Sequence, residues 1–208
     1  AVIGCSATGT ELIGSLIDNT NFNLIAIDGL HKPLQNYKSS VSDLVLETWK
    51  KNNVGLYFNN FVRKIDKNNI YFKNTNIKYD MAIWCGGIKK TVLSEKINNS
   101  LDLTCKFGIP VNNFLRVKNS YNVYAIGDCA YSKYAPTAQV AYQQGKYLAN
   151  RFNNNFKTDY FNYNHIGKTC YIGTGIGVFE NEYYSGGGKI IGYLNKFINF
   201  YNSLDFRK

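Results

Sequence analysis

The sequence lacks two features that would assign it to common classes of protein. It has no stretch of about eighteen apolar residues, so no segment is expected to cross a bilayer as a helix. Its five cysteines are odd in number and none forms a Cys-x-x-Cys pair, which argues against a disulfide framework, a zinc site or a dithiol redox centre and favours a reducing compartment. We therefore expect no metal site, and we find no convincing catalytic triad.

Blocks of like charge are also missing. The 208 residues carry a formal net charge of +10, but the lysines are spread along the chain. The positive charge suits an anionic partner such as a phosphate-bearing cofactor or an anionic lipid surface, and it is equally typical of a solvated surface filled with Lys and Asn. No basic face is interleaved with exposed aromatic residues at a recognisable spacing, so nucleic acid is not an expected partner.

The N-terminal residues follow the pattern of a strand, a turn, a helix and a second strand. Residues Ala1–Gly4 form a short apolar strand, and an amphipathic helix follows the turn. Asn21–Asp28 is the second strand, and its last residue, Asp28, lies 24 positions after Gly4. This spacing is typical of a Rossmann unit, in which the terminal carboxylate takes the ribose hydroxyls of the adenosine.

The turn between strand and helix departs from the G-x-G-x-x-G fingerprint. Gly4 and Gly9 occupy its first and last glycine positions, but Ser6 replaces the middle glycine. The missing side chain of that glycine lets the backbone approach a pyrophosphate bound at the helix N-terminus. Serine is small and can hydrogen-bond a phosphate, so we expect binding to survive at reduced affinity. The alternative is a βαβ unit that binds no ligand.

Residues 39–88 are predicted to complete a parallel sheet and to add a small antiparallel appendage. Ser39–Asn53 has its apolar residues at helical spacing. The expected strands are Val54–Phe58, Val62–Ile65, Ile70–Phe72 and Met81–Trp84. The last strand, which we expect to be buried, runs into Gly86 and Gly87, where the backbone can pass close to a ligand or turn into another domain.

The stretch at residues 122–130 is the most informative in the chain. Val123–Ile126 is a β-branched and aromatic run that fits a buried strand, and Gly127 and Asp128 follow it at once. Because ligands bind off the carboxyl ends of strands in an open α/β sheet, we expect Asp128 to accept a hydrogen bond from a ribityl or ribose hydroxyl. A helix is predicted over Thr137–Phe152, with its N-terminus beside the strand end.

Two segments carry a resemblance to a known family. Ala-Ile-Gly-Asp-Cys-Ala (residues 125–130) and Ala-Pro-Thr-Ala-Gln-Val-Ala-Tyr-Gln-Gln-Gly-Lys-Tyr-Leu-Ala (residues 135–149) together resemble the FAD-contacting C-terminal segment of the type II (alternative) NADH:quinone oxidoreductases. The first segment alone recurs across flavoproteins with two dinucleotide-binding domains, and the pair is more specific. The resemblance extends over nearly the whole chain, including the Gly4–Glu11 fingerprint.

The resemblance implies an α/β fold of the class with two dinucleotide-binding domains. Residues 1–88 would form a Rossmann-type NADH-binding domain with a truncated first strand, residues 89–160 the C-terminal part of an FAD-binding domain, and residues 161–208 a membrane-association region. In the middle part we expect a short helix and strands around Ile109–Val111 and Leu115–Val117. A family member needs a further glycine loop for FAD, so we expect a C-terminal fragment of a longer flavoprotein that does not retain FAD when expressed alone.

The resemblance also implies roles for particular residues. The residues expected to contact NADH or FAD are Gly4, Ser6, Gly9, Asp28, Gly87, Gly127, Asp128, Ala138 and Gln139. Gln139, facing the flavin ring, and Glu11, near the nicotinamide, are the expected catalytic residues. Gln139, Tyr142 and Gln143 would line a quinone channel. The alternatives are a solvent-facing helix stripe for Tyr142 and Gln143, and for Glu11 a carboxylate in a first helical turn that the helix dipole stabilises whatever the function.

The implied activity is that of an FAD-dependent NADH dehydrogenase. Hydride passes from NADH to FAD and two electrons then pass to a membrane quinone, without proton pumping. The implied location is the surface of the mitochondrial inner membrane or of a bacterial-type plasma membrane, and a homodimer is compatible with this. The alternatives are a sulfide:quinone or ferredoxin-type reductase, for which Cys85 and Cys129 are the only candidate redox cysteines, and a non-catalytic fragment with a basic binding surface.

The C-terminal residues predict a helix with one apolar face. The apolar positions are Ile190, Ile191, Leu194, Phe197, Ile198, Tyr201 and Leu204, with Asn195, Lys196, Asn199 and Asn202 opposite. The pattern fits a helix in the membrane interface, because seven such side chains at roughly 1 kcal/mol each give about 7 kcal/mol before ordering costs. Lys189, Lys196, Arg207 and Lys208 would each add about 1 kcal/mol near an anionic leaflet. The alternative is a helix packed on the protein's own core.

Overall fold

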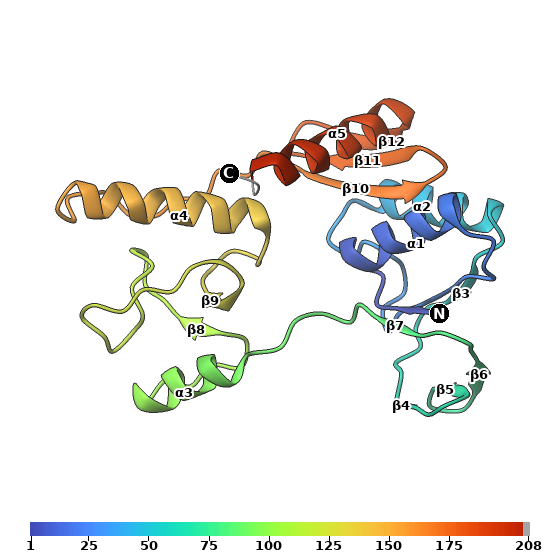
Figure 1. The fold of residues 1–208 in the computed structure, drawn as a ribbon, viewed down its shortest axis with the longest axis horizontal. Coiled ribbons are helices and arrows are strands. Elements are labelled where there is room, and N and C mark those ends of the chain that lie inside the picture. The colour runs from blue at the N-terminus through green and yellow to red at the C-terminus, as the bar shows by residue number, and fades with distance from the viewer. Residues whose placement is uncertain (206–208) are drawn as a thin grey trace. The chain divides into compact units, whose positions relative to one another are not determined.

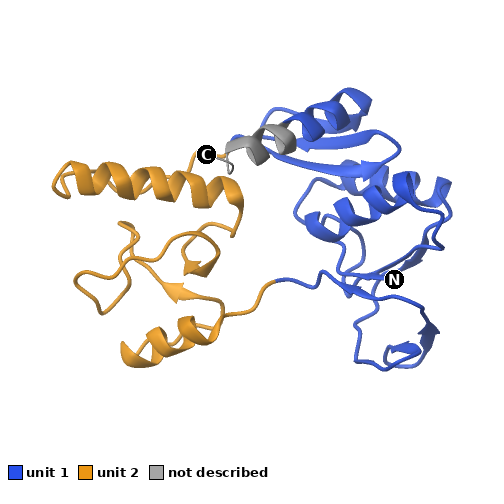
Figure 2. Cartoon of the chain, in the orientation of Figure 1, with its two compact units in different colours: residues 1–87, 166–208 blue, residues 88–165 orange. Residues whose placement is uncertain are grey.

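The chain divides into two compact units, which are described separately (Figure 1). The computed structural model describes the backbone of residues 1–205 and the side chains of residues 1–197. Unit 1 combines residues 1–87 with residues 166–208, and unit 2 is the segment between them, residues 88–165 (Figure 2). The C-terminal residues, expected as a separate region from residue 161, therefore belong from residue 166 to the same unit as the N-terminal ones.

A four-stranded parallel sheet with strand order β3-β2-β1-β7 forms the centre of unit 1. The strands are β1 Val2–Ile3, β2 Ile25–Ile27, β3 Gly55–Tyr57 and β7 Ile83–Trp84. The predicted parallel sheet is confirmed, but the predicted burial of Met81–Trp84 is wrong. β7 pairs only with β1 among the described strands, and an edge strand has one neighbour, so the Trp84 side chain is 60% exposed.

Two helices cover one face of this sheet and a small antiparallel sheet covers the other. The elements are α1 Ala7–Asn19 and α2 Ser39–Lys51 on the first face, and β4 Lys64–Ile65, β5 Asn69–Tyr71 and β6 Asn76–Lys78 on the second. Val41, Val45 and Trp49 of α2 are fully buried, which confirms the predicted periodicity. Ile70 of the appendage packs with Ile3 of the parallel sheet, so the predicted antiparallel appendage is confirmed as well.

A third sheet packs on the side of α1 and α2 that faces away from the parallel sheet (Figure 1). Its antiparallel strands are β10 Lys168–Gly173, β11 Ile176–Glu180 and β12 Ser185–Gly188. Cys170, Ile172 and Val178 are fully buried in the same core as α2. The predicted C-terminal helix is confirmed as α5 Lys189–Asp205, which packs against β11.

Unit 2 has a smaller core of its own. Its elements are α3 Val92–Ser100, β8 Ile109–Pro110, the 3-10 turn η1 Gly127–Cys129, β9 Ala130–Tyr131 and α4 Ala138–Asn153. β8 and β9 pair in parallel, and Leu115, Val117, Leu148 and Phe161 fill the space around them. The helix predicted over Thr137–Phe152 is confirmed.

The strand predicted at Val123–Ile126 does not form, and neither does the one at Leu115–Val117. Hydrogen bonds join the two segments from Val117 N–H to the Val123 carbonyl (2.8 Å) and from Ala125 N–H to the Leu115 carbonyl (3.2 Å). Leu115 has a left-handed backbone (φ 62°), which bends its segment away from a continuous ladder and leaves isolated bridges. The expected buried strand is therefore a partly exposed segment.

Candidate nucleotide and flavin sites

The glycine turn after β1 is packed so tightly that side chains do not fit. Gly4 has a left-handed backbone (φ +97°), and a Cβ added there would lie 2.6 Å from the carbonyl of Cys85. A Cβ on Gly9 would lie 1.8 Å from the Gly4 carbonyl oxygen. The two glycines thus let α1 begin directly at the carboxyl edge of the sheet, where its first N–H groups and the positive end of its dipole can hold an anion.

Asp28 lies beside this turn, immediately after β2. One carboxylate oxygen accepts a hydrogen bond from the Cys5 N–H at 2.6 Å, and the other accepts from the Leu30 N–H at 2.8 Å. Each oxygen retains lone-pair capacity for a ribose hydroxyl. The structure thus brings Asp28 and the glycine turn together, as predicted, and it adds a role that the sequence did not indicate: the carboxylate fixes the backbone of the turn.

Ser6 is the N-cap residue of α1 and is exposed. Its side chain forms no capping hydrogen bond within the described residues. The N-cap residues of α3 and α4 behave differently, because the Thr91 and Thr137 hydroxyls accept from N–H groups of the first helical turn. The Ser6 hydroxyl is therefore uncommitted at the turn where the usual fingerprint has glycine.

Gly87 lies at the same edge of the sheet, shortly after β7. Its backbone is left-handed (φ +98°), but no described atom lies within 4 Å of the position of an added Cβ. The need for glycine there is conformational and not steric. Gly86 differs, since its Cβ would lie 2.7 Å from the Trp84 ring.

Glu11 points from α1 toward the third sheet. Its carboxylate accepts from the Tyr171 N–H at 3.4 Å, and the Asn195 side chain also hydrogen-bonds it. Burial raises the pKa of Glu11, and these two donors partly oppose the rise. The first turn of α1 contains no acidic residue; Glu11 follows it, so the interpretation of Glu11 as a first-turn carboxylate is wrong.

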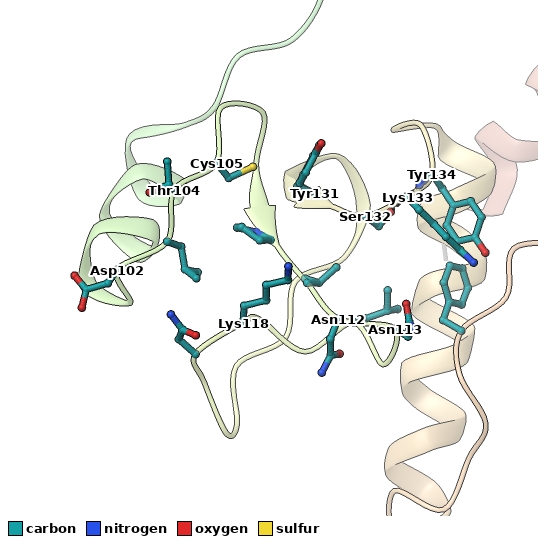
Figure 3. A pocket seen from close by; sticks show the side chains of 16 residues that line it. Asp102, Thr104, Cys105, Asn112, Asn113, Lys118, Tyr131, Ser132, Lys133 and Tyr134 are labelled. Carbon is teal, nitrogen blue, oxygen red and sulfur yellow. Dashed lines mark hydrogen bonds between the residues drawn. The ribbon is translucent and has the colours of Figure 1, made fainter.

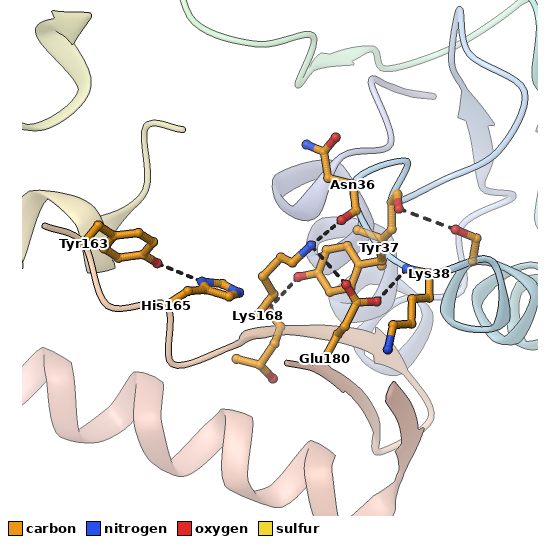
Figure 4. Close-up of polar contacts among 10 residues, drawn as sticks. Asn36, Tyr37, Lys38, Tyr163, His165, Lys168 and Glu180 are labelled. Carbon is orange, nitrogen blue, oxygen red and sulfur yellow. Dashed lines mark hydrogen bonds and ion pairs between the residues drawn. The ribbon is translucent and has the colours of Figure 1, made fainter. Parts of the chain in front are cut away.

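The loop after Asp28 is anchored at both ends within unit 1. Its Leu34 N–H donates to the Cys5 carbonyl at 2.9 Å. At its other end the Lys38 N–H donates to Glu180 Oε2 at 2.5 Å, and Lys168 pairs with Glu180 at 3.1 Å and donates to the Asn36 carbonyl (Figure 4). The glycine turn is thereby connected through one loop to strands β10 and β11.

In unit 2 the turn at Gly127 presents Asp128. Gly127 has a left-handed backbone (φ +69°) and its N–H donates to Gln144 Oε1 at 2.7 Å. Gln144 is buried on α4 between Val140 and Leu148, one turn away in each direction. Asp128 itself is exposed. A buried amide therefore holds the turn that exposes the expected flavin-side carboxylate.

Three of the predicted side chains on α4 have different surroundings. Gln139 Oε1 accepts from the Tyr163 hydroxyl. Gln143 pairs with the backbone of Asn164 in both directions, donating at 2.8 Å and accepting at 2.9 Å. Tyr142 is 64% exposed, as the helix-stripe alternative predicted. Gln139 and Gln143 thus hold the segment around residue 164 against α4, and their roles toward a quinone stay predictions.

Ala138 and Phe152 mark the two ends of α4. Ala138 is exposed at its first turn, beside the Thr137 cap, which leaves that end of the helix accessible. At the other end the Phe152 side chain is 46% exposed, because the buried positions of α4 are Val140, Gln144 and Leu148.

A cavity of about 580 Å³ lies in unit 2 away from these residues (Figure 3). Lys118, Lys133 and Asp102 bring charge to its lining, and Tyr131 and Tyr134 contribute aromatic rings. None of the predicted site residues lines it. Among the described residues no group of three or more His, Cys, Asp or Glu side chains is placed to hold a metal ion.

The sequence reasoning missed Gln144, Tyr163 and Asn195. Gln144 stands at the i+4 position from Val140 and the i−4 position from Leu148, so helical spacing alone could have placed it in the core. Tyr163 and Asn195 contact partners more than twenty residues away in the chain, and no local pattern indicates them.

The family model described as "Pyridine nucleotide-disulphide oxidoreductase" matches residues 1–145. The chain is 27% identical over 175 residues to a probable mitochondrial NADH-ubiquinone oxidoreductase of Schizosaccharomyces pombe, covering 73% of this chain and 32% of that protein. It is 27% identical over 185 residues to the mitochondrial external alternative NADH-ubiquinone oxidoreductase of Yarrowia lipolytica, covering 77% and 32%. A probable NADH dehydrogenase of Dictyostelium discoideum is 27% identical over 216 residues, covering 93% and 47%. The chain thus spans about a third to a half of the length of these relatives.

Solved structures share the fold. NDH2 from Plasmodium falciparum, solved in complex with NADH, matches with a TM-score of 0.85 at 21% identity, covering 95% of this chain and 60% of that chain. The reduced CoADR-RHD of Bacillus anthracis matches with a TM-score of 0.72 at 21% identity, covering 93% and 35%. The predicted α/β fold class is confirmed.

Proposed function

Because the chain belongs to the pyridine nucleotide-disulphide oxidoreductase family, we propose that it supplies the NADH-binding domain and part of the FAD-binding domain of a type II NADH:quinone oxidoreductase. Relatives named as NADH-ubiquinone oxidoreductases confirm the resemblance predicted from the sequence. The observation that carries the proposal is the carboxyl edge of the parallel sheet in unit 1. There the N-terminus of α1, two glycines without room for a side chain and the Asp28 carboxylate lie together.

This edge fits NADH in shape and in charge. The space that a Cβ on Gly4 or Gly9 would need is filled by backbone, so the turn stays narrow and its N–H groups remain accessible to a pyrophosphate. Ser6, with its uncommitted hydroxyl, would donate to the same phosphates. Asp28 would accept from the adenosine ribose, and Gly87 would let the chain pass close to the nicotinamide half.

The flavin-side residues are those of unit 2. Asp128 would accept from a ribityl hydroxyl, and Ala138 and Gln139 at the N-terminus of α4 would lie along the electron-rich ring. FAD would supply the redox chemistry by taking a hydride from NADH and giving two electrons to a quinone. The chain's own residues bind and orient these partners, and nothing in this reaction requires proton pumping.

A sulfide:quinone reaction receives less support from the cysteines. Burial raises the pKa values of the Cys5 and Cys85 thiols, which keeps them in the unreactive protonated form. Cys129 is exposed and its thiol donates to the Ile126 carbonyl at 3.2 Å. A nucleophilic pair of cysteines is therefore not favoured.

Gln139→Ala separates the two half-reactions in the complete flavoprotein. In the wild type NADH should bleach the flavin absorbance and a quinone should restore it. The variant should slow the quinone step by about tenfold, the size expected for losing one hydrogen bond to a polar partner in a dry site, and should leave bleaching by NADH nearly unchanged. Stopped-flow absorbance measures both rates.

Tyr163→Phe is the control for this prediction, because it removes the hydroxyl that Gln139 accepts from without removing the amide. If Gln139 acts on the quinone, Tyr163→Phe should cost less than Gln139→Ala in the quinone step. Equal slowing of both half-reactions by Gln139→Ala would make the residue structural, and a wild-type flavin that NADH does not bleach would overturn the proposed function.

We further propose that the protein binds a membrane surface through α5. Its exposed apolar side chains are Ile190, Tyr193, Leu194 and Phe197, which follow i, i+3, i+4 and i+7 spacing. The residues Ile198, Tyr201, Leu204, Arg207 and Lys208 of the predicted pattern lie outside the described side chains. No helix in the described part of the chain is long and apolar enough to span a bilayer, and the pattern fits a helix lying in the interface. The mitochondrial names of the relatives favour the inner mitochondrial membrane.

Leu194→Glu combined with Phe197→Glu should release the complete protein from liposomes. The two changes remove roughly 3 kcal/mol or more of apolar burial and add charge that the headgroup region disfavours. Co-sedimentation with anionic vesicles measures the bound fraction. Tyr183→Glu, at a side chain 89% exposed outside α5, is the matched control and should remain bound.

Two results would contradict membrane binding by α5. Unchanged sedimentation of the double variant would place the anchor elsewhere. In the second result neither the wild type nor the double variant binds liposomes, and light scattering shows a dimeric wild type and a monomeric variant. The exposed apolar side chains of α5 would then form a homodimer contact instead.

A further inference from the structure

Helix α5 has a polar residue on its buried face. Four apolar side chains of this helix point to solvent, whereas Asn195 is 2% exposed and Gly192 beside it is buried. The sequence pattern likewise places Asn195 opposite the apolar face of this helix. A buried amide is costly unless its donors and acceptor are satisfied, so its position calls for partners on the sheet below.

Those partners fix the orientation of the amide. The Thr169 hydroxyl donates to the Val178 carbonyl at 3.1 Å, so its single hydrogen is used. Asn195 Nδ2 lies 3.1 Å from Thr169 Oγ1 and must therefore be the donor of that contact. The Asn195 side chain also hydrogen-bonds the Glu11 carboxyl group. One amide nitrogen thus links a strand of the third sheet to the acidic side chain of α1.

Glu11 depends on this amide because its surroundings contain little positive charge. The titratable groups that face it are the Cys170 thiol of β10 and the Tyr37 hydroxyl; burial raises the pKa of both, and the charge of Glu11 adds to the rise. The nearby Lys168 pairs with Glu180. Among the described residues no lysine or arginine forms an ion pair with Glu11, so its donors are the Tyr171 N–H and the Asn195 amide.

We propose that Asn195 is the positioning residue for Glu11 in the NADH half-reaction. The inference rests on the proposed function, in which Glu11 acts near the nicotinamide. Glu11 lies on α1 just beyond the turn that begins at the glycine loop, and Cys170 of β10 contacts the Ala7 carbonyl in that turn. The Asn195 amide favours the ionised form of the carboxylate and holds it in place, and it does so from a helix whose opposite face carries the exposed apolar side chains.

The test compares Asn195→Leu, Glu11→Gln and the double variant in the complete flavoprotein. Leucine has the same branched arrangement of four side-chain heavy atoms as asparagine, and it removes the donor. Without the donor the pKa of Glu11 rises further, so the acid limb of flavin reduction by NADH moves to higher pH. We expect Asn195→Leu to slow this step about tenfold near pH 6 and much less near pH 9, with the quinone step unchanged.

The double variant decides whether the effect passes through Glu11. In the Glu11→Gln background, Asn195→Leu should change neither the rate nor its pH profile further. A loss that is equal at all pH values, or equal in both half-reactions and both backgrounds, would show that Asn195 only supports packing and would overturn the proposal. Thr169→Val keeps the helix contacts, frees the amide, and should give a smaller shift of the same acid limb.

Thermal unfolding provides a readout that does not need catalysis. At pH 8, Asn195→Leu should lower the melting temperature by about 2–4 °C more in the wild-type background than in the Glu11→Gln background. If NADH fails to reduce the flavin but this coupling is present, the proposed function fails and the Asn195 to Glu11 link stands. If the flavin is reduced normally and the coupling is absent, only the link fails.

Discussion

Gly9→Ala is expected to abolish detectable NADH binding and to destabilise unit 1 by about 3 kcal/mol, the upper end of ordinary over-packing costs. The added Cβ would lie 1.8 Å from the Gly4 carbonyl oxygen, which belongs to the backbone and cannot rotate away. Gly4 in turn lies against the backbone of Cys85 and Gly86, so relief requires moving α1 away from the sheet edge. NADH titration followed by fluorescence measures binding, and thermal unfolding measures stability.

Gly145→Ala is the matched control. Gly145 lies in the interior of α4, and no described atom lies within 4 Å of its added Cβ. The change should stabilise the helix by about 0.5–1 kcal/mol, because alanine has the higher helix propensity, and it should leave NADH binding unchanged. Wild-type NADH affinity in Gly9→Ala would show that the turn is not the binding site.

Asp28→Asn should weaken NADH binding by about tenfold to a hundredfold. Both carboxylate oxygens accept backbone N–H groups, and an amide replaces one of these acceptors with a donor, which leaves one N–H facing another and costs about 1–3 kcal/mol. The wild-type carboxylate should also favour NADH strongly over NADPH, because it repels a 2′-phosphate. The variant should lose most of that preference. Steady-state kcat/KM with both nucleotides measures it.

Asp43→Asn controls for charge alone. Asp43 is exposed on α2, and its neutralisation changes the net charge by the same amount without touching the turn. It should leave both nucleotides unaffected. Comparable turnover of NADPH and NADH by the wild type would contradict the assignment of Asp28.

Local sequence patterns predicted the helices and the Rossmann order well. The 3.6-residue period of Val41, Val45 and Trp49 places one stripe on the core whatever the tertiary partner is, and the structure buries all three. The spacing from Gly4 to Asp28 likewise reflects the geometry of one strand, turn and helix. Both patterns depend only on residues close together in the sequence, so they can be interpreted without knowledge of the rest of the fold.

Whether a segment forms a strand, and which face of a helix is buried, depends on neighbouring segments that the local sequence does not specify. Val123–Ile126 has strong β propensity, but a strand needs a continuous neighbour, and the left-handed residue Leu115 interrupts the available one. In α5 the apolar periodicity was correct, and the alternative in which this face packs on the protein's own core was wrong, because Gly192 packs against Gly175 and Gly177 where a larger side chain would not fit. Close backbone approach, and not hydrophobicity, decides which face is covered.

The candidate site shows the same division. The glycine turn was predictable because its backbone geometry demands particular residues at fixed spacing. The bonds from Cys5 to Asp28, from Gln144 to Gly127 and from Tyr163 to Gln139 join residues 17 to 24 positions apart, and they could be found only in the folded chain. These hydrogen bonds fix the positions of the residues that we expect to contact the ligands.

We propose that this chain carries out the NADH side of a quinone-reducing flavoprotein. An anaerobic titration of the complete protein with NADH, followed by a soluble quinone, tests it most directly through the flavin absorbance. We expect full bleaching at one NADH per flavin and full recovery at one quinone per flavin, with Gly9→Ala failing at the first step. A colourless protein, or a reduced flavin that quinone does not reoxidise, would contradict it.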